Sequence, residues 1–173
     1  MCTTLKFEEV YSWLNWHREY QSFLSVPVEK LIANMKTALE NMDYPKVEHY
    51  IGIAMEVCES LGNSLEIGET CLECAFAYSK MGQLPRSIPF LRQSISLFTA
   101  ENVHNRAIAL WMLGYVFWEV GRQSEAIVLW ERSCRIFQDL IGRNTNSRWY
   151  VNASRRMYGT LRVEIDERTG LDH

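Results

Sequence analysis

Helix-ending signals recur along this chain at a nearly constant spacing, and this spacing constrains the fold more than any other feature. Met42, Gly82 and Gly121 each follow a segment with helical periodicity, and they are 40 and 39 residues apart. Glycine in this position is typical of the left-handed residue that ends a helix. Pro45 and Pro85 come three residues after the first two stops, where proline favours the start of another helix. Self-similarity at this period predicts stacked helical hairpins.

The composition supports a folded chain with long helices. The 173 residues are 47% hydrophobic and 23% charged, and only 9 are Gly and 4 are Pro. These proportions exclude an intrinsically disordered or collagen-like chain. One short segment, LRVEI at 161–165, alternates in the manner of a strand, but we expect it to be helical as well.

The first 25 residues predict an amphipathic leading helix that runs from about residue 5 to residue 23. Apolar side chains such as Phe7 and Val10 recur there at spacings of three and four, which is the period of one helix face. Ser25 followed by Pro27 then predicts the start of the next helix. A hydroxyl can cap free amide groups there, and proline loses no hydrogen bond in a first turn.

The segment around Gly121, LWMLGYVFWEVGRQSEAIVLWERS, closely resembles a tetratricopeptide repeat. The segment around Gly82, CLECAFAYSKMGQLPRSIPFLRQS, is similar to that repeat to a lesser degree, and the segment around Met42 is the poorest match. Small residues stand where two helices touch, and large residues fill the space between hairpins. The signature positions hold Leu113, Gly114, Phe117, Gly121, Ala126, Trp130 and Ser133 in the third repeat; Cys74, Ala75, Tyr78, Gly82, Ser87, Leu91 and Ser94 in the second; and Asn34, Met35, Ala38, Met42, Val47, Ile51 and Ala54 in the first.

This resemblance implies an all-α, right-handed solenoid of three tetratricopeptide-like hairpins, with a leading helix and a C-terminal capping helix. The repeats are 39 to 40 residues long rather than the family's usual length of about 34, and Gln138 replaces the proline that usually closes the third repeat. Long repeats of this kind occur in regulatory and scaffold members of the family. The expected segments are a leading helix at 1–25, hairpins at about 26–62, 63–101 and 102–142, and a capping helix with a frayed tail at 143–173.

In this family, the first helix of each hairpin lines a concave groove that binds partner proteins. The resemblance therefore implies a groove with an aromatic strip that would anchor a bulky peptide or helix, because such rings bring large contact area at low entropic cost. Charged residues beside the strip would orient the ligand. The groove residues implied in this way are Lys36, Phe76, Lys80, Trp111, Tyr115, Trp118 and Glu119.

We therefore expect a non-enzymatic protein–protein interaction module that binds a protein or peptide partner, as an adaptor, scaffold or regulatory subunit. The groove lacks the Lys, Asn and Arg set with which some family members clamp a C-terminal carboxylate. In the alternative, the leading or closing helix fills the groove and buries its rings, since an open strip would expose a large apolar patch. The chain would then be a regulatory or oligomerisation domain, for example a homodimer, that controls an attached or associated enzyme or DNA-binding protein.

The residues that could carry chemistry form no recognisable catalytic constellation. Cys71 and Cys74 form a C-x-x-C pair that could bind metal or change redox state, together with Cys58 and His49. In the repeat register, however, both positions face the partner helix, and a second such pair is absent, so we interpret them as packing residues. The five cysteines are an odd number, which argues against a disulfide framework. We expect no enzymatic activity, no cofactor and no metal site.

The charge distribution limits the other classes of partner. The net charge is −3, and residues 1–70 carry 11 acidic side chains against 5 basic ones. Clustered basic residues supply most non-specific affinity for nucleic acid, so we do not expect a nucleic-acid partner. The sequence has neither a membrane-length apolar segment nor the features of a signal peptide, and we expect a cytoplasmic location without membrane binding.

Overall fold

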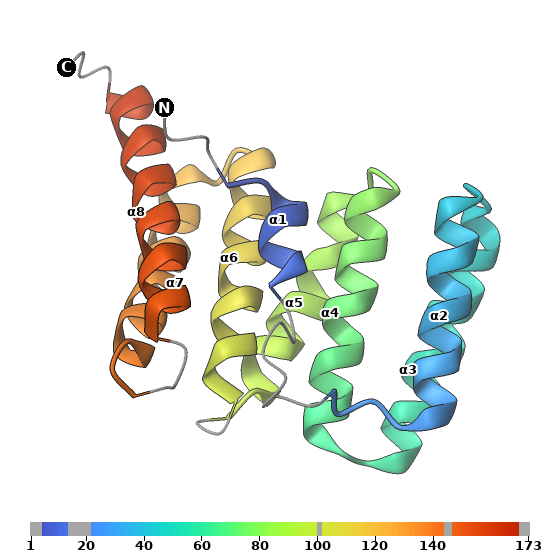
Figure 1. The fold of residues 1–173 in the computed structure, drawn as a ribbon. Coiled ribbons are helices and arrows are strands. Elements are labelled where there is room, and N and C mark those ends of the chain that lie inside the picture. The colour runs from blue at the N-terminus through green and yellow to red at the C-terminus, as the bar shows by residue number, and fades with distance from the viewer. Residues whose placement is uncertain (1–4, 14–21, 100–101, 144–146, 170–173) are drawn as a thin grey trace. The chain divides into compact units, whose positions relative to one another are not determined.

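The computed structural model is all-helical in its described residues, which confirms the all-α part of the prediction (Figure 1). It describes residues 5–13, 22–99, 102–143 and 147–169, and none of these residues forms a strand. The segment LRVEI is part of the last helix, as expected. The helices within the described residues are α1 (Phe7–Ser12), α2 (Val26–Glu40), α3 (Tyr44–Leu61), α4 (Ser64–Lys80), α5 (Leu84–Leu97), α6 (Val103–Glu119), α7 (Gln123–Leu140) and α8 (Ser147–Thr169).

Helices α2, α4 and α6 end in the same backbone geometry, at the three positions that define the sequence repeat. Met42, Gly82 and Gly121 have φ values of 57°, 74° and 87°, which lie in the left-handed region. The residue after each of them donates its N–H to a carbonyl five residues back, as Gln83 does to Tyr78 at 2.9 Å and Arg122 to Phe117 at 2.7 Å. These bonds satisfy carbonyls that the helix end would otherwise leave free.

The chain divides into two compact units, which are described separately. The terminal unit combines Met1–Leu14 with Arg106–His173, and the middle unit is Asn15–Asn105. This division separates α1 from α2 and groups α1 with helices that are about 100 residues later in the chain. The leading segment is therefore shared between two cores.

In the middle unit, α2 packs on α3, and α4 packs on both α3 and α5. A buried hydroxyl joins α4 and α5, because Ser94 Oγ on α5 donates to the carbonyl of Gly68 on α4 at 2.6 Å. Gly68 also leaves room for Phe98, whose ring would lie 3.1 Å from an added Cβ. The core that joins α2, α3 and α4 consists of Val28, Ile32, Met35, Ala38, Val47, Ile51, Ala54, Cys58, Cys74, Ala77, Tyr78 and Met81.

In the terminal unit, α7 packs on α8 and also contacts α6. Ser133 Oγ donates to the carbonyl of Ala107 at 2.7 Å, which repeats the bond between Ser94 and Gly68 with a displacement of 39 residues at both ends. The third repeat thus uses the same polar contact as the second. Helix α8 turns an apolar stripe inward, and Tyr150, Ala153, Met157 and Leu161 are buried on it.

Within the described residues, the leading segment is less helical than the sequence predicted. Helix α1 covers Phe7–Ser12, and residues 22–25 are not helical, although the prediction extended to residue 23. Residues 14–21 lie outside the described part of the chain. Ser25 precedes α2 as expected, but its side chain makes no capping bond. Asp43 does cap α3, because its carboxylate accepts from the N–H of Lys46.

None of the helices in the described part of the chain has the length and apolar character required to span a bilayer.

Candidate functional site

In the terminal unit, α1 lies against first-helix positions that the sequence assigned to a binding groove. Phe7 and Val10, one turn apart on α1, are buried. The ring of Phe7 lies with its centroid 5.3 Å from that of Tyr115 on α6. Just before α1, the backbone N–H of Leu5 donates to Thr160 Oγ1 on α8 at 2.7 Å. Tyr115 is therefore in contact with the chain's own N-terminal segment, and Figure 1 draws α1 beside α6.

An ion pair fixes the orientation of α1 on α8. Both guanidinium nitrogens of Arg156 meet the carboxylate of Glu9: Nη1 donates to Oε1, and Nη2 donates to Oε2 at 2.9 Å. Bidentate pairs of this kind are strongly directional. On α6, burial and the charges of Glu119 and Glu8 raise the pKa of Tyr115. The Tyr115 phenol is thus held in its neutral form beside Phe7.

The tryptophans on α6 pack around a tryptophan on α7. Trp111 and Trp118 stack on Trp130, with centroid distances of 5.2 and 5.4 Å. Between them, Gly114 has no side chain, and an added Cβ would lie 2.6 Å from the Trp130 ring. Trp111 is 0% exposed, so it is a core residue and does not line an open groove in this structure. Trp118 is half-buried, and Glu119 at the end of α6 is exposed.

In the middle unit, a short segment of the chain is held by carboxylates of α4. Glu69 accepts from Ser22 Oγ at 2.8 Å and from the backbone N–H of Phe23 at 2.7 Å. Glu66 accepts from the backbone N–H of Ser25 at 2.5 Å. Both glutamates are buried, and Glu69 is only 1% exposed. These bonds satisfy backbone donors that a continuous leading helix would have satisfied internally.

The other predicted groove residues of the middle unit are engaged on the surfaces of α2 and α4. Lys36 Nζ lies 3.2 Å from the carboxylate of Glu73. Lys80 Nζ lies 5.8 Å from the centroid of the Phe76 ring, within the range of a cation–π contact. The seven predicted residues are thus divided: Lys36, Phe76 and Lys80 belong to the middle unit, and Trp111, Tyr115, Trp118 and Glu119 belong to the terminal unit.

Sequence reasoning did not identify the residues that hold the N-terminal segment. Glu66, Glu69 and Glu73 recur at spacings of three and four, so a single acidic face on α4 was visible in the pattern. Acidic residues are rarely buried, and the pattern contained nothing to indicate that all three are. Arg156 and Thr160 on α8 lie about 150 residues from their partners Glu9 and Leu5, and no local pattern connects them.

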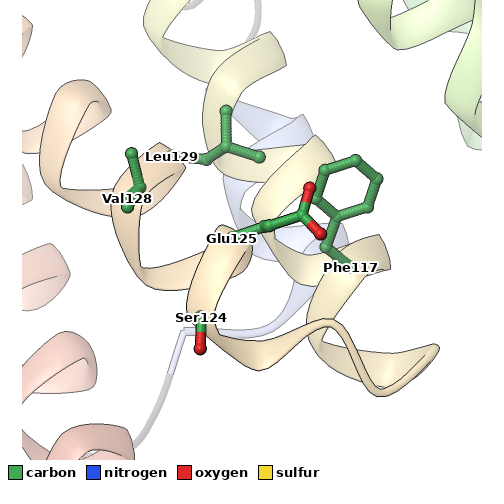
Figure 2. A pocket seen from close by; sticks show the side chains of 5 residues that line it. All are labelled: Phe117, Ser124, Glu125, Val128 and Leu129. Carbon is green, nitrogen blue, oxygen red and sulfur yellow. The ribbon is translucent and has the colours of Figure 1, made fainter.

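The terminal unit also has a surface pocket of about 360 Å³ at the end of α6 and the start of α7 (Figure 2). Phe117, Val128 and Leu129 supply its apolar lining, and Ser124 and Glu125 lie beside them. The carboxylate of Glu125 is paired with the guanidinium of Arg122, which also covers the ring of Phe117 at 4.1 Å. The lining offers apolar contact beside one hydroxyl and one carboxylate.

The cysteines within the described residues are packing residues in both units. Cys58, Cys71, Cys74 and Cys134 are free thiols, and all four are buried. Burial raises the pKa of Cys71 to about 12 and does the same for Cys134. Because the thiolate is the reactive form, these side chains are weak nucleophiles at neutral pH. The placement of Cys71 and Cys74 agrees with the packing interpretation of the C-x-x-C pair.

Histidines and carboxylates do not converge with the cysteines on a cation site within the described ranges. His49 lies on the exposed side of α3, and His104 is buried in α6. His17 and His173 lie outside the residues that the structure describes. No group of three or more His, Cys, Asp or Glu side chains in the described part of the chain has the geometry to hold a metal ion.

Comparison with known proteins gives no family for this chain. No protein-family model matches the sequence, and neither a curated protein nor a solved structure shows significant similarity to it.

Proposed function

We propose that this protein is a non-enzymatic protein–protein interaction module that binds a helix or peptide of a partner protein along the first helices of its hairpins. The observation that supports this most directly is that both units already bind a segment of their own chain at such positions. In the terminal unit, Tyr115 packs on Phe7 of α1. In the middle unit, Glu69 accepts two hydrogen bonds from residues 22 and 23. Surfaces that hold helical and extended segments in cis are suited to hold them in trans.

We assign the architecture to a tetratricopeptide-like solenoid as part of the same proposal. The three helix ends with a left-handed residue support this assignment, since they recur with the 40- and 39-residue spacing of the sequence. The serine-to-carbonyl bonds of the second and third repeats also support it. In such arrays, each repeat presents equivalent residues to the same surface. The four buried free cysteines are compatible with a reducing compartment such as the cytoplasm.

Site-specific photo-crosslinking in cells tests the proposal. A photoreactive amino acid would replace Lys80 or Glu119, which are exposed at the ends of first helices α4 and α6. Matched controls would carry it at Gln93 or Arg132, which are exposed on second helices α5 and α7. We expect a discrete protein adduct from the first-helix positions and none from the controls. Adducts from the control positions alone, or from none of the four, would contradict the proposal.

A second candidate function is a closed regulatory or oligomerisation domain, and the complete burial of Trp111 favours it. In that case, α1 stays in place, and the protein acts through another surface or another copy of itself. Light scattering combined with acrylamide quenching separates the two functions. A concentration-dependent dimer whose tryptophan emission resists quenching supports the closed domain, whereas a monomer that gains adducts at Glu119 supports the interaction module.

A further inference from the structure

Helix α1 shows which kind of ligand the surface of α6 and α8 accepts. Its two apolar anchors, Phe7 and Val10, are one turn apart and buried. Its carboxylate, Glu9, lies one residue before the second anchor and meets Arg156 with both oxygens. Apolar anchors with helical spacing and one charge pair are the usual elements of helix-in-groove recognition. The apolar contacts supply affinity, and the charge pair fixes orientation and selects the partner.

The helical form of α1 depends on the surface beneath it. The helix has only six residues, its N-terminal flanking residue is Lys6, and the Lys6 side chain makes no capping bond. Isolated helices shorter than about 12–15 residues are marginal in water, and the favourable placement of Glu8 and Glu9 in the first turn is a small effect beside this short length. The surface therefore recognises a segment that folds as it binds, and another segment with the same pattern can compete with the tethered α1 for it.

We propose that the surface formed by Tyr115, Arg156 and Thr160 binds a short acidic amphipathic helix of a partner protein, and that this helix competes with α1 for the site. The helix carries two apolar anchors at positions i and i+3 and a carboxylate at i+2, as Phe7, Val10 and Glu9 do in cis. This inference rests on the proposed function, and it specifies the class of partner for the terminal unit.

A charge-reversal experiment on the full chain tests this inference. The probe is a fluorescein-labelled peptide with the sequence of residues 5–13, LKFEEVYSW, and binding is followed by fluorescence anisotropy. In the Glu9→Arg chain, α1 carries an arginine that is repelled by Arg156, while Arg156 stays available to the carboxylate of the peptide. We expect this chain to bind the peptide at least tenfold more tightly than the wild type, in which α1 occupies the surface.

The reciprocal variant makes the prediction specific to this contact. In the Arg156→Glu chain, Glu9 is repelled, so we expect a peptide with arginine in place of Glu9 to bind and the original peptide to bind at least tenfold more weakly. Arg155→Glu is the matched control, because Arg155 is adjacent and exposed. In the Glu9→Arg background, it should leave peptide affinity within about twofold.

The outcomes distinguish this inference from the function on which it rests. If neither peptide binds its matching variant, or if affinity does not follow the charge at position 156, the inference is overturned. It is also overturned if circular dichroism shows that both reversed chains are unfolded, since α1 would then be a fixed part of the core. If the peptide does not bind but adducts still form at Glu119, only the inference of an acidic helical partner is overturned. If the peptide does not bind and no adducts form, the proposed interaction module is overturned as well.

Discussion

At the scale of single residues, Gly114 determines how closely α6 and α7 approach. An added Cβ would lie 2.6 Å from the Trp130 ring and 3.2 Å from the carbonyl oxygen of Ala126. The indole N–H of Trp130 donates to the carbonyl of Trp111 at 3.1 Å, so the ring cannot shift without loss of this bond. Gly114 is therefore a packing requirement of the third repeat, as its place in the repeat signature predicted.

We predict that Gly114→Ala lowers the free energy of unfolding by about 1–3 kcal/mol, because overpacking of a fitted core is destabilising. Chemical denaturation followed by circular dichroism measures the change. Gly52→Ala is the matched control: Gly52 is an exposed glycine of α3, and its added Cβ would contact nothing within 4 Å. This control should gain about 0.5–1 kcal/mol. Equal effects at the two positions would show that the contact with Trp130 is unimportant.

Single buried thiols make the stability of the folded chain depend on pH. Cys71 has a pKa of about 12 in the folded chain, against an ordinary value of 9.0, because burial disfavours its thiolate. Between these values, the unfolded chain loses the thiol proton while the folded chain keeps it, so stability is fully present below pH 9 and is lost as pH rises toward 12. The expected slope is about 1.4 kcal/mol per pH unit for each such thiol.

We predict that Cys71→Ala makes the alkaline loss of stability less steep, because it removes one of the protons retained by the folded state. Urea denaturation at several values above pH 9 measures the slope. Cys134→Ala should have a similar effect, since Cys134 also has a pKa of about 12. Wild-type steepness in both variants would show that these thiols ionise equally easily in the folded and unfolded chains.

At the scale of helices, the sequence predicted a helix end correctly where the end depends on neighbouring residues alone. The ends of α2, α4 and α6 follow from one left-handed residue each, and that conformation involves only neighbouring backbone. The end of the leading helix did not follow from its sequence. The apolar pattern continues through residues 23 and 24, but the backbone N–H groups of Phe23 and Ser25 donate to Glu69 and Glu66 of α4. A contact across more than 40 residues overrides the local period there.

We predict opposite effects of glycine exchange at two equivalent helix ends. Met42 adopts φ of 57° and is 72% exposed, so Met42→Gly should relieve backbone strain, lose little packing and gain up to about 1 kcal/mol. Gly82→Ala should lose about 1 kcal/mol or more, because its φ of 74° is unfavourable for a residue with a Cβ. Thermal unfolding of both variants measures the two shifts, and shifts of the same sign would refute the shared geometry.

At the scale of the whole molecule, the terminal unit is assembled from the two ends of the chain. Leu5, Phe7 and Val10 are buried in the same unit as α6, α7 and α8. The sequence predicted an amphipathic leading segment, and it left open whether this segment or a partner protein covers the aromatic residues of the third repeat. The structure places α1 on Tyr115, which reduces the open aromatic surface and makes access to it depend on α1.

We predict that Val10→Ala lowers the stability reported by tryptophan fluorescence by about 1–3 kcal/mol, because the fully buried valine leaves a cavity. The measurement uses a Trp16→Phe background, in which every remaining tryptophan belongs to the terminal unit. Val26→Ala is the control, because Val26 is 64% exposed, and it should change stability by less than about 0.5 kcal/mol. If Val10→Ala behaves like this control, α1 does not contribute to that core.

The sequence by itself determined the helical class, the repeat period, the three left-handed helix ends and the packing role of Cys71, because each depends on local periodicity or on the size of one side chain. Only the tertiary structure decided that Trp111 is core, that α1 covers Tyr115 and that Glu66 and Glu69 bind residues 22–25. These outcomes depend on contacts between segments tens to more than a hundred residues apart. The pattern of a helix face shows that it is apolar or charged, and which segment covers that face is a property of the folded chain.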